Sequence, residues 1–212
     1  MLQKIQFFSK KTNNFYQLFP TKTIPTLRIN GVPMHRYIKI DPLVDTKSKI
    51  AALKPNGTVL DTCTGLGYTS IYSAKSPEVN EVITFERDPE VLKITKMNES
   101  SNDLFTDKKI KIINKDVSLG IKELDDSTFD CIMHDPPTFT ISPVLYELKF
   151  YKELYRVLKN NGRLWHYAPT PGKAKSQSKA NNFVLGIINK LKEAGFKKIF
   201  HDEKSSGIIA RK

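Results

Sequence analysis

Two short segments combine residue types that could bind a nucleoside and act on an amine. The first, residues 59–68, is an apolar run that ends in Asp61 and continues as a turn through Gly65 and Gly67. A parallel strand delivers its carboxyl end to a nucleotide-like ligand in this way. The second, Asp135-Pro136-Pro137, places a carboxylate and a rigid backbone carbonyl after another apolar run. Together they predict a cofactor site beside a site that accepts hydrogen bonds from a substrate amine.

Acidic residues follow three successive predicted strands and indicate what the first site binds. Glu86 can accept hydrogen bonds from both hydroxyls of a ribose, and Asp116 from an adenine amino group. The turn after Asp61 lacks the third in-phase glycine with which a helix approaches a pyrophosphate. A cationic adenosine ligand is therefore favoured over an anionic dinucleotide. S-adenosylmethionine fits, because its sulfonium, its ammonium and its ribose are all matched.

The elements that must position these residues alternate between strand and helix after residue 40. The pattern predicts an α/β fold, a Rossmann-like doubly wound sheet that is mostly parallel, with ligands at the carboxyl ends of its strands. The predicted strands cover residues 58–61, 81–86, 109–114, 129–134 and 163–167, with a final antiparallel pair at 196–201 and 207–211. The predicted helices cover residues 43–53, 68–75, 88–97, 146–159 and 181–194.

The first predicted helix has Leu43, Val44, Ile50 and Leu53 as its apolar positions. Residues 1–40 do not follow the strand–helix rhythm, and we expect them to form a small β-rich or irregular appendage to a domain at 41–212. Residues 169–179 are polar, basic and rich in Pro and Gly, which predicts a mobile loop.

On these motifs the chain resembles class I S-adenosylmethionine-dependent methyltransferases. More narrowly, it resembles a family of predicted archaeal methyltransferases with LDTCTGLGYT-like and HDPP-like motifs, here Leu60–Thr69 and His134–Pro137. The resemblance covers roughly residues 34–200 and implies a seven-stranded sheet with a reversed terminal hairpin and S-adenosylmethionine as the cofactor. We assign the following residues to the cofactor site: Asp61, Thr62, Gly65, Leu66, Gly67, Glu86, Arg87, Asp116 and Val117.

The acceptor motif suits transfer to an exocyclic amine of a base, whose nitrogen lone pair is delocalised into the ring. Hydrogen bonds from both N–H groups to the Asp135 carboxylate and the Pro136 carbonyl would favour localising that pair, while Pro137 stiffens the segment. The motif resembles the (D/N/S)PP(Y/F/W/H) signature of amino-group N-methyltransferases, but its fourth residue here is Thr. Phe139 is our candidate for stacking on the base, or else an anchor for the loop. His134 is a candidate general base, or else a hydrogen-bonding residue at the strand end.

Charge is segregated along the chain. The net charge is +12 over 212 residues, and both ends are basic while the middle is mildly acidic. Lys/Arg-rich segments of this kind favour a polyanionic partner, and we expect RNA, bound through the N- and C-terminal segments. Neither the two cysteines nor the histidines have the spacing of a metal site, and the apolar runs are too short to cross a bilayer. We expect a cytoplasmic protein.

The leading hypothesis is N-methylation of cytosine N4, guanine N2 or adenine N6 in ribosomal or transfer RNA. A protein N-methyltransferase acting on lysine or glutamine is the second hypothesis. An aminopropyltransferase is a remote third, because holding a polycation needs acidic residues and the termini are basic. A non-catalytic RNA-binding scaffold is a remote fourth. Lysine abundance and the resemblance favour an archaeal source.

Overall fold

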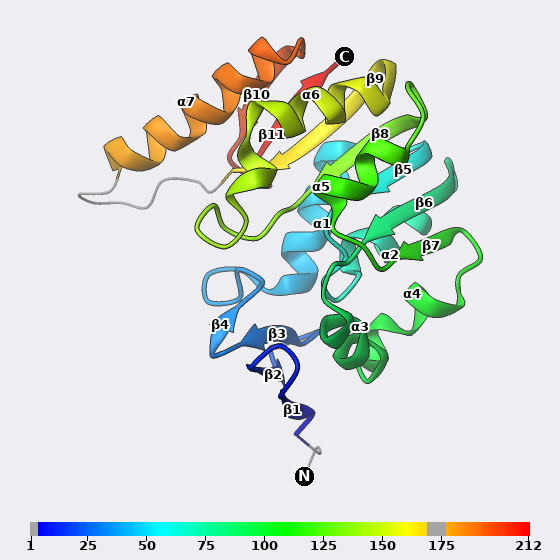
Figure 1. Ribbon diagram of the computed structural model, residues 1–212, viewed down its shortest axis with the longest axis vertical. Helices are drawn as coiled ribbons and strands as arrows, with labels where there is room; N and C mark the ends of the chain where they lie inside the picture. Colours follow the sequence, from blue (N-terminus) through cyan, green and yellow to red (C-terminus); the bar gives the residue numbers. More distant parts are fainter. Residues whose placement is uncertain (1–3, 169–176) are drawn as a thin grey trace.

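The computed structural model describes residues 4–168 and 177–212, which form two β-sheets and their flanking helices (Figure 1). The small N-terminal sheet is an antiparallel meander of β1 (Gln6–Ser9), β2 (Asn14–Phe19), β3 (Thr26–Ile29) and β4 (Val32–Pro33). The appendage is therefore β-rich, as predicted, while its boundary at residue 40 stays a prediction.

The large sheet has seven strands and carries the sequence motifs. In spatial order they are β10 (Lys197–Asp202), β11 (Gly207–Arg211), β9 (Leu158–Tyr167), β8 (Phe129–His134), β5 (Gly57–Asp61), β6 (Val79–Phe85) and β7 (Ile110–Ile113). The pairs from β9 through β7 are parallel, and β11 runs antiparallel to both of its neighbours. This is the predicted Rossmann-like seven-stranded sheet with a reversed terminal hairpin.

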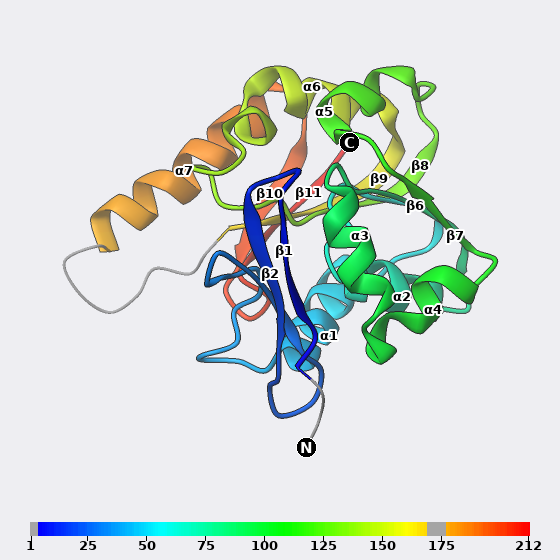
Figure 2. The same cartoon turned by 60° about the horizontal axis from the view of Figure 1, so that its bottom comes forward.

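Helices cover both faces of the large sheet (Figures 1 and 2). The α-helices are α1 (Pro42–Leu53), α2 (Tyr68–Ala74), α3 (Pro89–Lys96), α4 (Asn102–Thr106), α5 (Val117–Gly120), α6 (Leu148–Val157) and α7 (Gln177–Glu193). Short 3-10 helices lie at Glu99–Ser101, Ile121–Glu123 and Pro143–Tyr146. The short helices α4 and α5 were not predicted, because each spans about one turn and shows no periodicity.

Strand β8 shows how the sequence encodes the two layers. Ile132 packs into the core beneath α6 and α7, whereas its neighbours Cys131 and Met133 pack into the core on the side of α1 and α2. Both faces are buried, so the strand is a continuous apolar run rather than an alternating one. The sheet thereby brings the carboxyl ends of β5, β6, β7 and β8 to one edge.

One apolar position of the predicted first helix, Val44, does not face the protein interior on α1. Val44 is 54% exposed, and the positions facing the protein include Asp45, Thr46 and Lys49. The apolar residues of an amphipathic helix usually face the protein interior. The inner face of α1 instead carries the ion pair between Asp45 and Lys49, to which other charged residues bind.

The predicted loop at 169–179 lies largely outside the described residues. Within the described part of the chain, no helix has the length and apolar character that crossing a bilayer demands.

Candidate active site

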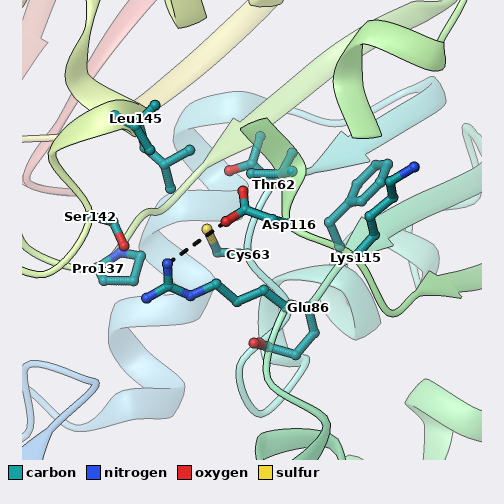
Figure 3. Close-up of a pocket in the computed structure, with 12 residues that line it drawn as sticks. Thr62, Cys63, Glu86, Lys115, Asp116, Pro137, Ser142 and Leu145 are labelled. Atoms are coloured by element: carbon teal, nitrogen blue, oxygen red, sulfur yellow. Dashed lines mark ion pairs between the residues drawn. The ribbon is translucent and has the colours of Figure 1, made fainter. Parts of the chain in front are cut away.

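A cleft opens at the carboxyl edge of the parallel strands (Figure 3). Its floor comes from the ends of β5 and β6, and its walls come from the segments that follow β7 and β8. The predicted cofactor residues that line it are Thr62, Glu86, Arg87, Asp116 and Val117. Its lining also includes Cys63, Phe85, Lys115, Pro137, Ser142, Val144 and Leu145.

Glu86 directly follows β6 and is held in place by two backbone N–H groups. Gly65 N donates to its Oε2 and Asp88 N donates to its Oε1, each at 3.0 Å. Burial raises the pKa of Glu86 to about 7, against the lowering effect of those two hydrogen bonds. A ligand that donates hydroxyl hydrogen bonds to this carboxylate would favour its ionised form.

Asp116 caps the short helix α5 and faces Arg87 across the cleft. Its Oδ1 accepts from the backbone N and the hydroxyl of Ser118, at 2.8 and 2.7 Å. Its Oδ2 lies 3.8 Å from Arg87 Nη1, the ion pair drawn in Figure 3. Because Asp116 is oriented by the cap, its second oxygen remains directed at the cleft, next to Val117.

Asp61 and the glycine turn lie behind the cleft rather than in its lining. Asp61 is 1% exposed, and its Oδ2 accepts from Thr69 Oγ1 at 2.7 Å and Ser70 Oγ at 2.6 Å, so it anchors the start of α2. Burial raises its pKa to about 6. Direct contact between Asp61 and a cofactor stays a prediction.

Gly67 and Leu66 shape the turn. Gly67 has φ +76°, and a Cβ there would lie 2.6 Å from the Leu104 side chain, so glycine is required on both counts. Leu66 is 1% exposed and belongs to the core beneath the N-terminal sheet. Gly65 has φ +51° with open space where its Cβ would be, and its backbone N–H and carbonyl are bound by Glu86 and Thr95.

The donor set of the cleft fits S-adenosylmethionine. The Glu86 carboxylate matches the ribose hydroxyls, the capped Asp116 matches an adenine amino group, and acidic side chains at the strand ends match a cationic ligand. Val117, Val144 and Leu145 supply the apolar surface that a purine ring needs.

Asp135 lies at the carboxyl end of β8, where the cofactor cleft meets a second group of charged residues. Its Oδ2 accepts from Lys49 Nζ at 2.6 Å, and Lys49 also lies 2.8 Å from Asp45 Oδ2. Arg36 donates to Asp45 Oδ1 from Nε at 3.1 Å and also through Nη2. We call Arg36, Asp45, Lys49 and Asp135 the acceptor-side charge cluster.

One oxygen of Asp135 is uncommitted. Among the described residues, neither its Oδ1 nor the carbonyl of Pro136 has a hydrogen bond, whereas the Pro137 carbonyl accepts from Tyr146 Oη at 2.9 Å. Pro137 also lines the cleft. The motif therefore offers two acceptors close to the place where a cofactor would bind.

His134 and His166 lie together beneath this motif. Both are 0% exposed, and their rings are 4.5 Å apart and nearly perpendicular. His134 is bonded at Nδ1 to Thr62 Oγ1 at 2.8 Å and at Nε2 to the Leu145 carbonyl at 3.0 Å. Burial holds the pKa of His134 well below its usual range. With both nitrogens hydrogen-bonded, His134 positions Thr62 and the loop after β8, as the hydrogen-bonding alternative expects, and a role as general base stays a prediction.

Phe139 is 48% exposed and packs edge-on against Tyr146 and Phe183, with ring centroids 5.8 and 6.4 Å away. It lies on the rim formed by the loop after β8 and by α7 rather than in the lining of the cleft. Stacking of a base on Phe139 stays a prediction.

Sequence reasoning missed Asp45 and Lys49. Both lie on α1, and the available signal was their i,i+4 spacing on a face that burial of the helix must turn inward. Arg36 belongs to the same group, because its guanidinium forms an ion pair with Asp45.

Comparison with known proteins identifies a family. The family model described as "Methyltransferase small domain" matches residues 43–197. An uncharacterized protein of Methanocaldococcus jannaschii is 42% identical over 202 residues, covering 94% of this chain and 68% of the relative. A polyamine aminopropyltransferase of Prochlorococcus marinus is 28% identical over 147 residues, covering 68% of this chain and 50% of the relative. The chain thus spans about half the length of that aminopropyltransferase.

Solved structures share the fold. A spermidine synthase from Thermotoga maritima aligns with a TM-score of 0.72 at 15% identity, over 97% of this chain and 71% of the other. An S-adenosylmethionine-dependent methyltransferase from Methanococcus maripaludis aligns with a TM-score of 0.56 at 18% identity, over 81% and 85%. At these identities the likeness shows the fold alone.

Proposed function

We propose a substrate for this chain, which belongs to the methyltransferase small domain family and uses S-adenosylmethionine as its cofactor. The proposed reaction is N-methylation of an exocyclic amino group of a base in structural RNA. The cofactor supplies an electrophilic methyl group on a sulfonium. The chain's own task is to orient an amine and to take up its proton.

The observation that carries the proposal is the hydrogen bonding of the two carboxylate oxygens of Asp135. Lys49 holds its Oδ2, which leaves Oδ1 as an oriented acceptor beside the cofactor cleft. A planar amine can donate one hydrogen to Oδ1 and the other to the Pro136 carbonyl, which favours a lone pair directed away from the ring. Asp135 then accepts the proton that the amine loses. The ammonium of Lys49 forms an ion pair with the other oxygen of this carboxylate, at 2.6 Å.

RNA as the partner rests on charge. The described N-terminal segment exposes Lys4, Lys10, Lys11, Lys22 and Lys39. In Figures 1 and 2 the N-terminal sheet lies on the same side of the molecule as the loops that carry the cleft. Exposed lysines there can neutralise the phosphates that flank a presented base.

The test is transfer of radiolabelled methyl from S-adenosylmethionine to protease-treated total RNA, followed by mass spectrometry of the nucleosides. A labelled N-methylated nucleoside is expected. Asp135→Ala should lower transfer by about 10²-fold or more, as loss of an oriented electrostatic partner does, while cofactor binding persists. Asp130→Ala, at the opposite end of β8, is the matched control and should stay active.

Label appearing in a protein fraction but not in RNA would refute the RNA assignment and favour the protein N-methyltransferase. An active Asp135→Ala variant would refute the acceptor assignment itself.

A second candidate, aminopropyl transfer, is favoured by one observation. The solved spermidine synthase matches 97% of this chain, so the likeness includes the N-terminal sheet, and the curated aminopropyltransferase matches 68% of it. Incubation with decarboxylated S-adenosylmethionine and putrescine discriminates the two. Formation of spermidine would favour this candidate over methylation.

A further inference from the structure

The acceptor-side charge cluster is electrically balanced. Lys49 Nζ lies between Asp135 Oδ2 at 2.6 Å and Asp45 Oδ2 at 2.8 Å, and Arg36 binds the other oxygen of Asp45. Two cations thus face two carboxylates. The acids that line the cofactor cleft, Glu86 and Asp116, lie where the positive charge of the cofactor would offset theirs.

The side chain of Lys49 is buried and does not lie on the protein surface. Its side chain is 6% exposed and that of Asp45 is 1% exposed. The ammonium also lies 5.5 Å from the ring centroid of Trp165 and 5.9 Å from that of Tyr167. Two carboxylates and two aromatic rings therefore hold the ammonium of Lys49 in place. Because the side chain is buried among them, it keeps this conformation when a substrate enters.

A cationic amine would gain little from this site. An ammonium group that leaves water must be compensated by a net negative environment. Here the ammonium of Lys49 already offsets the negative charge of Asp135, the carboxylate that such a cation would meet. The same ammonium would repel the cation at close range. A neutral amine needs only a hydrogen-bond acceptor, and Asp135 Oδ1 remains available as one.

We propose that Lys49 is a specificity-determining residue that restricts the acceptor site to neutral amines and rejects polycationic ones. The inference rests on the proposed function, because both assign Asp135 to the acceptor side. It goes further by naming the residue that separates this chain from an enzyme acting on polyamines.

The test is direct binding of spermidine by isothermal titration calorimetry, which requires no RNA and no turnover. Lys49→Gln leaves Asp135 unneutralised, and its affinity for spermidine should rise by about tenfold or more over that of the native chain. Lys49→Arg keeps the charge and should leave the affinity unchanged. Lys47→Gln removes the same charge from the exposed face of α1 and is the matched control. Adding Asp135→Asn to Lys49→Gln should abolish the gain.

Thermal unfolding and cofactor binding establish first that each variant folds. If Lys49→Gln does not fold, Arg36→Gln carries the test, because Arg36 is 29% exposed and its loss also leaves the cluster with one net negative charge. Unchanged spermidine affinity in the folded charge-removing variants would overturn the inference, and so would tight binding by the native chain. A gain in affinity without RNA methylation would refute the proposed substrate and leave the role of Lys49 standing.

Discussion

Cofactor binding should weaken as the pH falls from 8 to 6, through Glu86. Burial raises the pKa of this carboxyl to about 7 in the free protein, and the ribose hydroxyls bind its ionised form more strongly, because a neutral carboxyl is a weaker acceptor with fewer free lone pairs. Protons and ligand therefore compete. The ionised fraction falls from about 0.9 at pH 8 to about 0.1 at pH 6, so the affinity should fall by up to about tenfold, or up to about 1.4 kcal/mol.

The clean probe is 5′-methylthioadenosine, which presents the ribose and adenine but lacks the amino-acid group that titrates in S-adenosylmethionine itself. Its dissociation constant can be measured by calorimetry at pH 8, 7 and 6, in buffers of different ionisation enthalpy so that proton release is counted. The series stops at pH 6, because the buried Asp61 carboxyl, whose pKa is about 6, is half protonated there and would dominate below it.

Glu86→Gln should bind the probe more weakly and without this pH dependence, because the amide does not titrate. Glu81→Gln is the matched control on the same strand, since Glu81 pairs with Lys111 and does not line the cleft. A constant affinity from pH 8 to 6 in the native chain would refute the reasoning, as would a pH slope that survives in Glu86→Gln.

Two further predictions concern stability. Gly207→Ala would place a Cβ 2.1 Å from Trp165 Nε1 in a closed core and should lower the free energy of unfolding by about 1–3 kcal/mol. Gly186→Ala, which has open space on α7, should leave the free energy of unfolding unchanged or raise it. Chemical denaturation of the two variants measures the difference. Tyr16→Phe removes a 2.6 Å hydrogen bond to the Asp88 carboxylate and should cost about 1.5–3 kcal/mol, seen as a lower midpoint; an unchanged midpoint would contradict the bond.

The parallel sheet was predictable because each strand is an apolar run bounded by turn residues. The predicted limits of β8 agree with the structure residue for residue, and Asp88 caps α3 as expected, accepting from Glu90 N at 2.9 Å. Such features are local. A strand buried on both faces, or a helix that begins with Asp-Pro, can be recognised from a few consecutive residues of the sequence.

The charge cluster was not predictable in the same way. Asp45 and Lys49 resemble a solvated ion pair on an exposed helix face, and the sequence supports that interpretation until Asp135 and Arg36 are known to converge on them. Their separation along the chain, from residue 36 to residue 135, removes any local signal. The exposure of Val44 follows from the same cause, since the helix turns toward its charged partners.

The N-terminal segment belongs to both halves of the site. On the cofactor side, Tyr16 Oη donates to Asp88, and the backbone N of Asp88 donates to Glu86. On the acceptor side, Arg36 binds Asp45, which holds the lysine that in turn holds Asp135. The appendage thus connects through Asp88 to the carboxylate that would receive the ribose, and through Asp45 and Lys49 to the carboxylate that would receive the amine. A mobile attachment could not make both connections at once, so its sheet must dock in a single orientation for the cleft and the acceptor to face each other.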